Sequence, residues 1–205
     1  MFNSKFNMIV LLDPGHGSNT PGKRSPDGRL REYHYNRELA ALIMYGLRRE
    51  GIETRIIVNE EVDVPLSERI RRVNDICNEV GKSNVLLVSI HCNAAGDGTQ
   101  WTSATGWECY TSPGKTKADK LATAIYNEAD KYLPECHRRR ADWSDGDPDK
   151  EARFYMLIHS KCAAVLTENL FMDNKADVDY MLSTKGIVTL ANIHIEGIVN
   201  FINNG

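Results

Sequence analysis

Short apolar runs alternate with amphipathic segments along this 205-residue chain. Apolar runs bounded by turn residues are typical of buried strands, and apolar residues repeated every three or four positions are typical of helices. The predicted strands span residues 7–12, 52–58, 84–90, 106–110 and 162–167. The predicted helices span residues 32–50, 66–80, 121–132 and 185–203. This order predicts an α/β fold: a single domain with a mainly parallel, twisted sheet and helices on both faces of that sheet.

The composition is that of an ordinary folded domain, and it excludes several classes of protein. Hydrophobic residues make up 41% of the chain and charged residues 26%, and the formal net charge is −3. A near-neutral chain without a long basic stretch does not have the charge pattern of a nucleic-acid-binding protein. No apolar run approaches the roughly 20 residues that a membrane-spanning helix needs, so no membrane span is expected.

The N-terminal sequence and the cysteines indicate where the chain is made. Residues 1–7 are polar and lack the apolar core of a secretory signal. The chain has five cysteines, an odd number, and no Cys-x-x-Cys pair. We therefore expect reduced thiols and synthesis in the cytoplasm without a signal peptide.

Candidate catalytic residues follow three of the predicted strands. The first strand is followed by His16 within the sequence DPGHG, the strand at 84–90 by His91, and the last strand by Glu168. Glu32 begins the helix after the first strand. Because the carboxyl ends of parallel strands meet at one edge of a sheet, we expect these four side chains to converge there.

Two histidines and two glutamates at one edge suit a zinc ion. A catalytic zinc site uses three protein ligands, often two histidines and one carboxylate, and leaves a position for water. The remaining carboxylate is then available as a general base toward that water and as a general acid toward a leaving amine. The other histidines lie in predicted helices or in a polar loop, and we expect structural roles for them: His34, His137, His159 and His194.

Several segments, in order, resemble the zinc-dependent N-acetylmuramoyl-L-alanine amidases of the type 3 family. Residues 9–22 (IVLLDPGHGSNTPG) are similar to the opening strand and first histidine ligand of that family. Glu32, followed by Asn36 on an apolar helix, is similar to its glutamate-ligand segment. The other similar segments are residues 66–69 (LSER) with Asn74, residues 89–94 (SIHCNA) and residues 164–174 (AVLTENLFMDN). The resemblance extends over nearly the whole chain.

The resemblance implies a role for each candidate residue. His16, Glu32 and His91 would hold one zinc ion, and Glu168 would be the general base and acid. The reaction would be hydrolysis of the amide that joins N-acetylmuramic acid to L-alanine in peptidoglycan, by a water that the zinc activates. Asn169 and Leu170 stand where the family more usually has small residues, which changes the expected shape of the substrate groove. Some members carry an inhibitory helix, but residues 134–152 are too polar for one, so we predict a surface loop and an open site.

Three alternative functions remain open at this point. A zinc peptidase acting on the stem peptides of peptidoglycan would use a similar metal site, although the chain lacks the HExxH motif. A cysteine hydrolase would use Cys92 as its nucleophile, but adjacent residues on a strand point to opposite faces, so His91 would not face it. A non-catalytic wall-binding domain would keep the fold without the reaction.

The expected substrate lies outside the cell, whereas the chain carries no recognisable export signal. Three explanations are open: a phage or prophage endolysin, a mother-cell lytic enzyme freed by lysis, or a natural N-terminus that this sequence lacks. We favour the endolysin, which is released by cell lysis. We expect one catalytic domain over residues 1–205, without a separate wall-binding domain. Contacts with the wall would then come from aromatic residues of the domain itself, for which Trp101, Trp107 and Trp143 are candidates. We expect a monomer.

Overall fold

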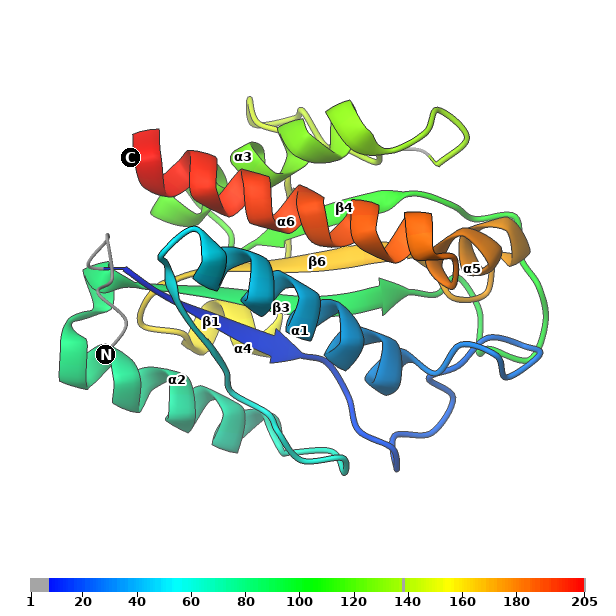
Figure 1. Cartoon of the computed structure of the whole chain (residues 1–205), viewed down its shortest axis with the longest axis horizontal. Helices are drawn as coiled ribbons and strands as arrows, with labels where there is room; N and C mark the ends of the chain where they lie inside the picture. Colours follow the sequence, from blue (N-terminus) through cyan, green and yellow to red (C-terminus); the bar gives the residue numbers. More distant parts are fainter. Residues whose placement is uncertain (1–7, 138, 205) are drawn as a thin grey trace.

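The computed structural model describes residues 8–137 and 139–204, which form a layered α/β domain (Figure 1). The strands are β1 (Ile9–Pro14), β2 (Glu53–Ile56), β3 (Val85–Asn93), β4 (Trp107–Thr111), β5 (Lys150–Glu151) and β6 (Ala163–Phe171). The helices are α1 (Glu32–Arg49), α2 (Leu66–Val80), α3 (Lys117–Tyr132), α4 (Tyr155–His159), α5 (Lys175–Met181) and α6 (Thr184–Asn204), with a short 3-10 helix η1 (Lys82–Asn84).

The sheet is mainly parallel, as predicted. Its strands lie in the order β2-β1-β3-β6-β4-β5. Strand β4 runs antiparallel to β6, while the other neighbouring pairs are parallel. The carboxyl ends of β1, β3 and β6 therefore lie at the same edge of the sheet, which is the edge where α/β sheets bind their ligands.

Helices cover both faces of the sheet, which confirms the predicted layers (Figure 1). On one face, α1, α3 and α6 pack against side chains such as Leu86, Val88 and Val165. On the other face, α2 and α4 pack against alternate residues of the same strands, such as Leu87 and Leu166. Because successive strand residues point to opposite faces, an uninterrupted apolar strand supplies both cores.

Some short elements lie outside the predicted ones. Strand β5 and helices α4 and α5 were not predicted, because segments of this length carry too little periodicity to be distinguished from loop. The predicted surface loop at 134–152 is partly wrong, since it contains β5 and two buried polar residues, His137 and Asp149. Within the described residues 134–137 and 139–152 there is no helix, as expected.

Helix α3 begins earlier than its apolar pattern indicates, and its capping explains the difference. Thr116 Oγ1 accepts a hydrogen bond from the backbone N–H of Ala118, and the Asp119 carboxylate accepts one from the backbone N–H of Thr116. Such a capping box satisfies N–H groups that have no partner inside the helix. The polar residues before Leu121 are therefore helical.

Across residues 8–137 and 139–204, every helix falls short of the length or the apolar character that crossing a membrane requires.

Candidate metal centre and active site

The four predicted site residues meet at the carboxyl edge of the central strands. His16 follows β1, His91 lies in β3, Glu168 lies in β6, and Glu32 is the first residue of α1. The strands extend beyond the predicted apolar runs, so His91 and Glu168 are strand residues and do not follow the strand ends. Their positions are consequently set by the sheet ladder, which is more rigid than a loop.

His16, Glu32 and His91 form a compact group with the geometry of a metal site. One ligand atom from each residue lies within 4.8 Å of the other two. Glu32 Oε1 is 3.5 Å from His16 Nε2 and 3.3 Å from His91 Nδ1. The two imidazole rings are perpendicular, with centroids 5.0 Å apart. The three side chains therefore present their ligand atoms toward a common point.

These distances and the hydrogen bonding of Glu32 fit a zinc ion. Ligand atoms around a tetrahedral zinc lie roughly 3.3 Å apart, given bonds of about 2.0–2.1 Å. Glu32 is fully buried, and its Oε2 atom has no hydrogen-bond partner among the described residues. Its Oε1 atom accepts a hydrogen bond from the backbone N–H of Cys92, which orients the carboxylate. A buried carboxylate oxygen without a partner is costly, and a cation at this point would satisfy it.

The group contains opposing electrostatic effects. Burial raises the pKa of Glu32, but the hydrogen bond with His91 and the charges of His91 and His16 outweigh burial, so the pKa lies below its usual value. Burial lowers the pKa of His16 to about 4. Burial also lowers the pKa of His91, but Glu32 and Glu168 outweigh that effect and raise it overall. His16 is thus neutral at pH 7, the state in which an imidazole binds a metal.

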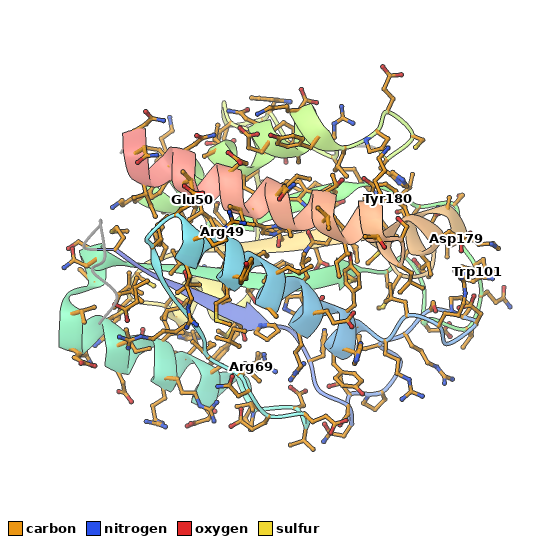
Figure 2. All side chains as sticks on the ribbon, viewed as in Figure 1. Arg49, Glu50, Arg69, Trp101, Asp179 and Tyr180 are labelled. Atoms are coloured by element: carbon orange, nitrogen blue, oxygen red, sulfur yellow. The ribbon has the colours of Figure 1, made fainter. Side chains whose placement is uncertain are left out.

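The backbone at His16 is held in an unusual conformation by two arginines. His16 has a φ of 63°, in the left-handed region that non-glycine residues rarely adopt. Arg37 Nη1 and Arg69 Nη2 both donate hydrogen bonds to its carbonyl oxygen, at 3.0 and 3.3 Å. Arg69 reaches this point from the first turn of α2 (Figure 2). It also donates to Asp13 Oδ1 at 2.7 Å and to Asp63 Oδ1 at 2.8 Å.

Arg69 is the functional residue that the sequence analysis missed, although residues 66–69 were among the similar segments. The residue is 1% exposed and also donates to the carbonyl oxygens of Pro14 and Val64. A buried guanidinium with this many acceptors fixes the turn that carries His16. Nothing in the local pattern of an amphipathic helix distinguishes such a buried arginine from a surface one.

Gly15, directly after β1, lets the backbone pass close to the His91 ring. A Cβ atom at this position would lie 2.2 Å from the His91 ring. The backbone N–H of Gly15 donates to the carbonyl of Ile90, which joins the two segments. Any larger residue at position 15 would displace the His91 imidazole.

Glu168 stands directly beside the three candidate metal ligands. Its Cα pairs with that of His91 across the β3–β6 ladder. The Oε2 atom is buried and has no hydrogen-bond partner among the described residues. Burial raises the pKa of Glu168 to about 8, and the charge of Glu32 adds to this effect while that of His91 opposes it. A carboxylate with an elevated pKa and a free oxygen can both accept and donate a proton near neutral pH.

A buried polar network supports the other side of this ladder. The Asn169 side chain donates to the His91 carbonyl at 3.0 Å and to Thr167 Oγ1 at 3.2 Å, and it accepts from Trp107 Nε1 at 3.1 Å. His194 Nε2 lies 2.9 Å from Thr167 Oγ1. Asn169 is therefore buried and holds the His91 backbone from the opposite face of the sheet. It does not line the substrate groove, contrary to our expectation from its unusual identity.

The remaining aromatic and histidine predictions have mixed outcomes. Trp107 is fully buried, so the expectation that it contacts the wall is wrong. Trp101 is 37% and Trp143 62% exposed, and Trp101 lies on the loop before β4 (Figure 2). His137 is buried, with Nδ1 2.9 Å from Asp177 Oδ1, and it is no part of the metal group.

The environment of Cys92 does not suit a nucleophile. The side chain is 3% exposed, and its Sγ atom contacts Asn36 Oδ1 at 3.4 Å. Burial raises the pKa of the thiol well above its usual value, with the charges of Glu32 and Glu168 adding to the effect. The reactive thiolate is therefore disfavoured, which argues against a cysteine hydrolase.

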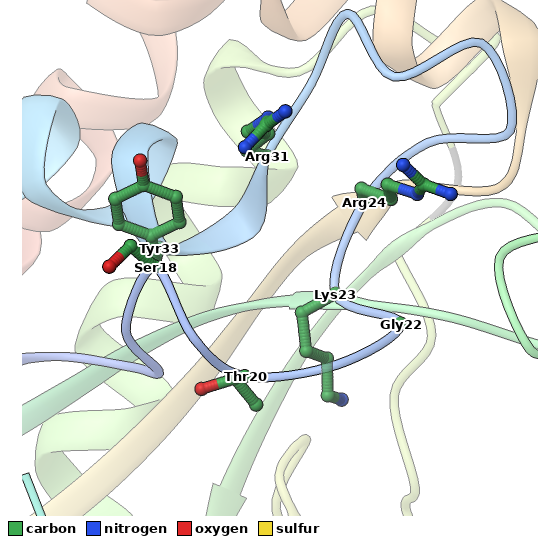
Figure 3. Close-up of a pocket in the computed structure, with 7 residues that line it drawn as sticks. All are labelled: Ser18, Thr20, Gly22, Lys23, Arg24, Arg31 and Tyr33. Carbon is green, nitrogen blue, oxygen red and sulfur yellow. The ribbon is translucent and has the colours of Figure 1, made fainter. Parts of the chain in front are cut away.

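A basic pocket of about 180 Å³ adjoins the metal group (Figure 3). Its charged lining residues are Lys23, Arg24 and Arg31, and the Lys23 Nζ atom is 3.9 Å from Glu32 Oε2. The other lining residues are Ser18, Thr20, Gly22 and Tyr33. The site is thus bordered on the α1 side by positive charge.

Comparison with known proteins identifies the family of the chain. The family model described as N-acetylmuramoyl-L-alanine amidase matches residues 10–200. The chain belongs to this family. The amidase hydrolyses the amide between N-acetylmuramic acid and L-alanine in peptidoglycan, as the sequence analysis expected.

Individual relatives support the same assignment. The sporulation-specific N-acetylmuramoyl-L-alanine amidase of Bacillus subtilis (strain 168) is 25% identical over 195 residues, which are 95% of the amidase and 68% of that relative. The endolysin of Bacillus phage SPP1 is 27% identical over 204 residues, covering 95% of the amidase and 66% of the endolysin. The crystal structure of an N-acetylmuramoyl-L-alanine amidase from Clostridium difficile 630 superposes with a TM-score of 0.81 and 25% identity, covering 96% and 97% of the two chains.

Proposed function

We propose that the amidase is zinc-dependent, with His16, Glu32 and His91 holding one zinc ion and Glu168 acting as the general base and acid. The observation that carries this proposal is the group of three ligand atoms within 4.8 Å, in which the buried Glu32 Oε2 atom has no hydrogen-bond partner among the described residues. When bound, the ion would polarise the amide carbonyl and lower the pKa of the attacking water.

Glu168 performs the proton transfers of the proposed mechanism. Its unpartnered Oε2 atom accepts a proton as the water oxygen bonds to the carbonyl carbon. The same carboxyl group then donates that proton to the L-alanine nitrogen as the carbon–nitrogen bond breaks. Its elevated pKa, about 8, favours this second step, because the protonated form is then accessible at neutral pH.

The remaining residues orient the reacting groups. Arg69 and Arg37 hold the turn that carries His16, and the Cys92 N–H holds Glu32. The side chains of His16 and His91 are 20% and 17% exposed, so the ligand edge is accessible from solvent.

Digestion of purified cell walls tests the zinc proposal. We expect that a chelator abolishes the appearance of free amino groups on L-alanine, and that added zinc restores it. Mass spectrometry of the fragments should show cleavage between N-acetylmuramic acid and L-alanine. Cleavage within the stem peptide would instead favour a zinc peptidase, and wall binding without release would favour a non-catalytic domain. Full activity in chelator would contradict the metal proposal.

We also propose that this single domain works as a monomer and reaches the wall after lysis of the producing cell. Release by lysis is supported by the similarities to a sporulation-specific amidase and to a phage endolysin. Expression in a bacterial cytoplasm should leave cells intact until the membrane is permeabilised, and sedimentation should give the mass of one chain. Lysis without permeabilisation would contradict the proposed route to the wall. Sedimentation as a dimer would contradict the monomer.

A further inference from the structure

A second buried glutamate lies beside Glu168 on the same face of the sheet. Glu108 in β4 is the Cα partner of Glu168 in β6, and it is 2% exposed. Directly opposed residues of an antiparallel pair point to the same face. His91, Glu168 and Glu108 consequently form one row across β3, β6 and β4. The row extends the active site toward β5, away from the pocket of Figure 3.

Both oxygens of Glu108 are occupied by neighbouring groups. Oε1 contacts Arg140 Nε at 2.8 Å and Lys150 Nζ at 3.0 Å. Oε2 accepts hydrogen bonds from the Tyr110 hydroxyl and from Asn93 Nδ2. The buried carboxylate thus anchors two cations at a fixed place next to Glu168.

Arg140 and Lys150 are partly exposed and have N–H donors that do not contact Glu108. The side chain of Arg140 is 41% exposed and that of Lys150 is 25% exposed. Arg140 contacts Glu108 through Nε and lies over the Phe171 ring, and its terminal guanidinium nitrogens have no hydrogen-bond partner among the described residues. Lys150 has further N–H donors. Two positive charges around one carboxylate leave an excess of one positive charge beside the reaction centre. Donors and charge of this kind suit a carboxylate ligand.

We propose that Arg140 and Lys150 bind a carboxylate of the stem peptide, on the leaving-amine side of the scissile bond. This inference rests on the proposed function, in which Glu168 donates its proton to the L-alanine nitrogen. Lys150 pairs with Tyr110, which is level with Leu166, so the Lys150 Cα lies two strands across and two residues along from Glu168, or roughly 12 Å at the usual strand spacings. An extended peptide spans up to about 3.3–3.6 Å per residue, and the long cation side chains cover part of the distance. The carboxylate of the residue after L-alanine is therefore the group within reach.

A matched pair of substrates tests the subsite. The substrates are solubilised glycan strands whose stem peptides carry a free carboxyl group, or the corresponding carboxamide, on the residue after L-alanine. For the wild-type amidase we expect kcat/KM to be about tenfold higher with the carboxylate, the size of one charge-assisted hydrogen bond. Arg140→Gln and Lys150→Gln should each reduce this preference severalfold through KM, so that hydrolysis of the carboxylate substrate falls more than hydrolysis of the carboxamide. Arg140→Lys should restore part of the preference.

Lys131→Gln is the matched control. Lys131 Nζ also contacts a buried glutamate, Glu128, at 3.0 Å, but it belongs to α3, which covers the opposite face of the sheet. This variant should keep the wild-type preference. A purely structural role for Arg140 and Lys150 would lower both activities equally, which would overturn the proposal.

The other outcomes are also decisive. Equal wild-type activity on both substrates would overturn the inference while leaving the proposed function intact, whereas activity on neither would contradict the proposed function itself. If Arg31→Gln removed the preference and Arg140→Gln did not, the carboxylate would bind in the pocket of Figure 3, and the present assignment would be wrong.

Discussion

His91 and Glu168 are direct partners across the ladder between β3 and β6. A proposed metal ligand and the proposed proton carrier therefore share one register of hydrogen bonds, with Asn169 holding the His91 carbonyl from the opposite face. The relative position of the two side chains depends on the sheet, and a change in this ladder would alter both functions together.

Replacement of Glu168 by glutamine should remove the proton carrier and retain the metal ligands. We expect kcat/KM for wall hydrolysis to fall by roughly 10²–10⁴-fold, the range for loss of a general acid–base group. Zinc should still bind, because His16, Glu32 and His91 are unchanged. A variant with more than half of the wild-type activity would contradict the role of Glu168.

The same substitution should alter the protons released when zinc binds. At pH 7 Glu168 is mainly protonated, since its pKa is raised to about 8 by burial, and a nearby cation favours the carboxylate. Zinc binding to the wild-type chain should therefore release about one proton more than binding to Glu168→Gln. Titration calorimetry in buffers of different ionisation enthalpy measures this difference. Equal release by both proteins would contradict it.

Gly15→Ala should weaken zinc binding through His91. The added Cβ would lie 2.2 Å from the His91 ring, so the imidazole must move. We expect zinc affinity to fall about 10–100-fold, the usual effect of losing a contact that orients a metal ligand. Gly96→Ala is the control, because its Cβ would meet no atom closer than 3.5 Å. Competition with a chelating dye measures both affinities, and equal values would contradict the argument.

Arg69→Met should destabilise the fold and the turn that carries His16. The substitution leaves the buried Asp13 carboxylate without its cation, at a cost of about 3–5 kcal/mol in the free energy of unfolding. Arg71→Met on the same helix breaks only exposed ion pairs, which contribute about 0–1 kcal/mol. Urea unfolding compares the two variants, and similar losses would show that Arg69 has no special role.

His194 should make stability depend on pH. Burial lowers its pKa from 6.5 to about 4, so the unfolded chain binds a proton more readily between these values. The free energy of unfolding should therefore decrease as pH falls from 6.5 to 4, by about 3 kcal/mol from this residue, and this loss is absent above pH 6.5. His194→Gln should remove that part of the slope, whereas Val188→Gln, exposed on the same helix, should keep it. Parallel slopes for wild type and His194→Gln would contradict the prediction.

The local sequence was sufficient to predict the layers of the fold and the four residues at the sheet edge. Apolar runs and helical spacing record which side of each segment is buried, and parallel strands then bring His16, His91 and Glu168 to a common edge. These properties are local, because each depends on residues a few positions apart. The short elements β5, α4 and α5 lacked such a signal.

Contacts between distant residues were decided only by the tertiary structure. Arg69 meets Asp13 across 56 positions, and Lys150 meets Glu108 across 42. The antiparallel pairing of β4 with β6 places Glu108 beside Glu168. An amphipathic pattern shows that a side chain faces inward, but the partner that it finds there depends on register and on neighbouring elements. The sequence therefore determined which residues we propose to carry the chemistry, and the fold determined what holds them in position.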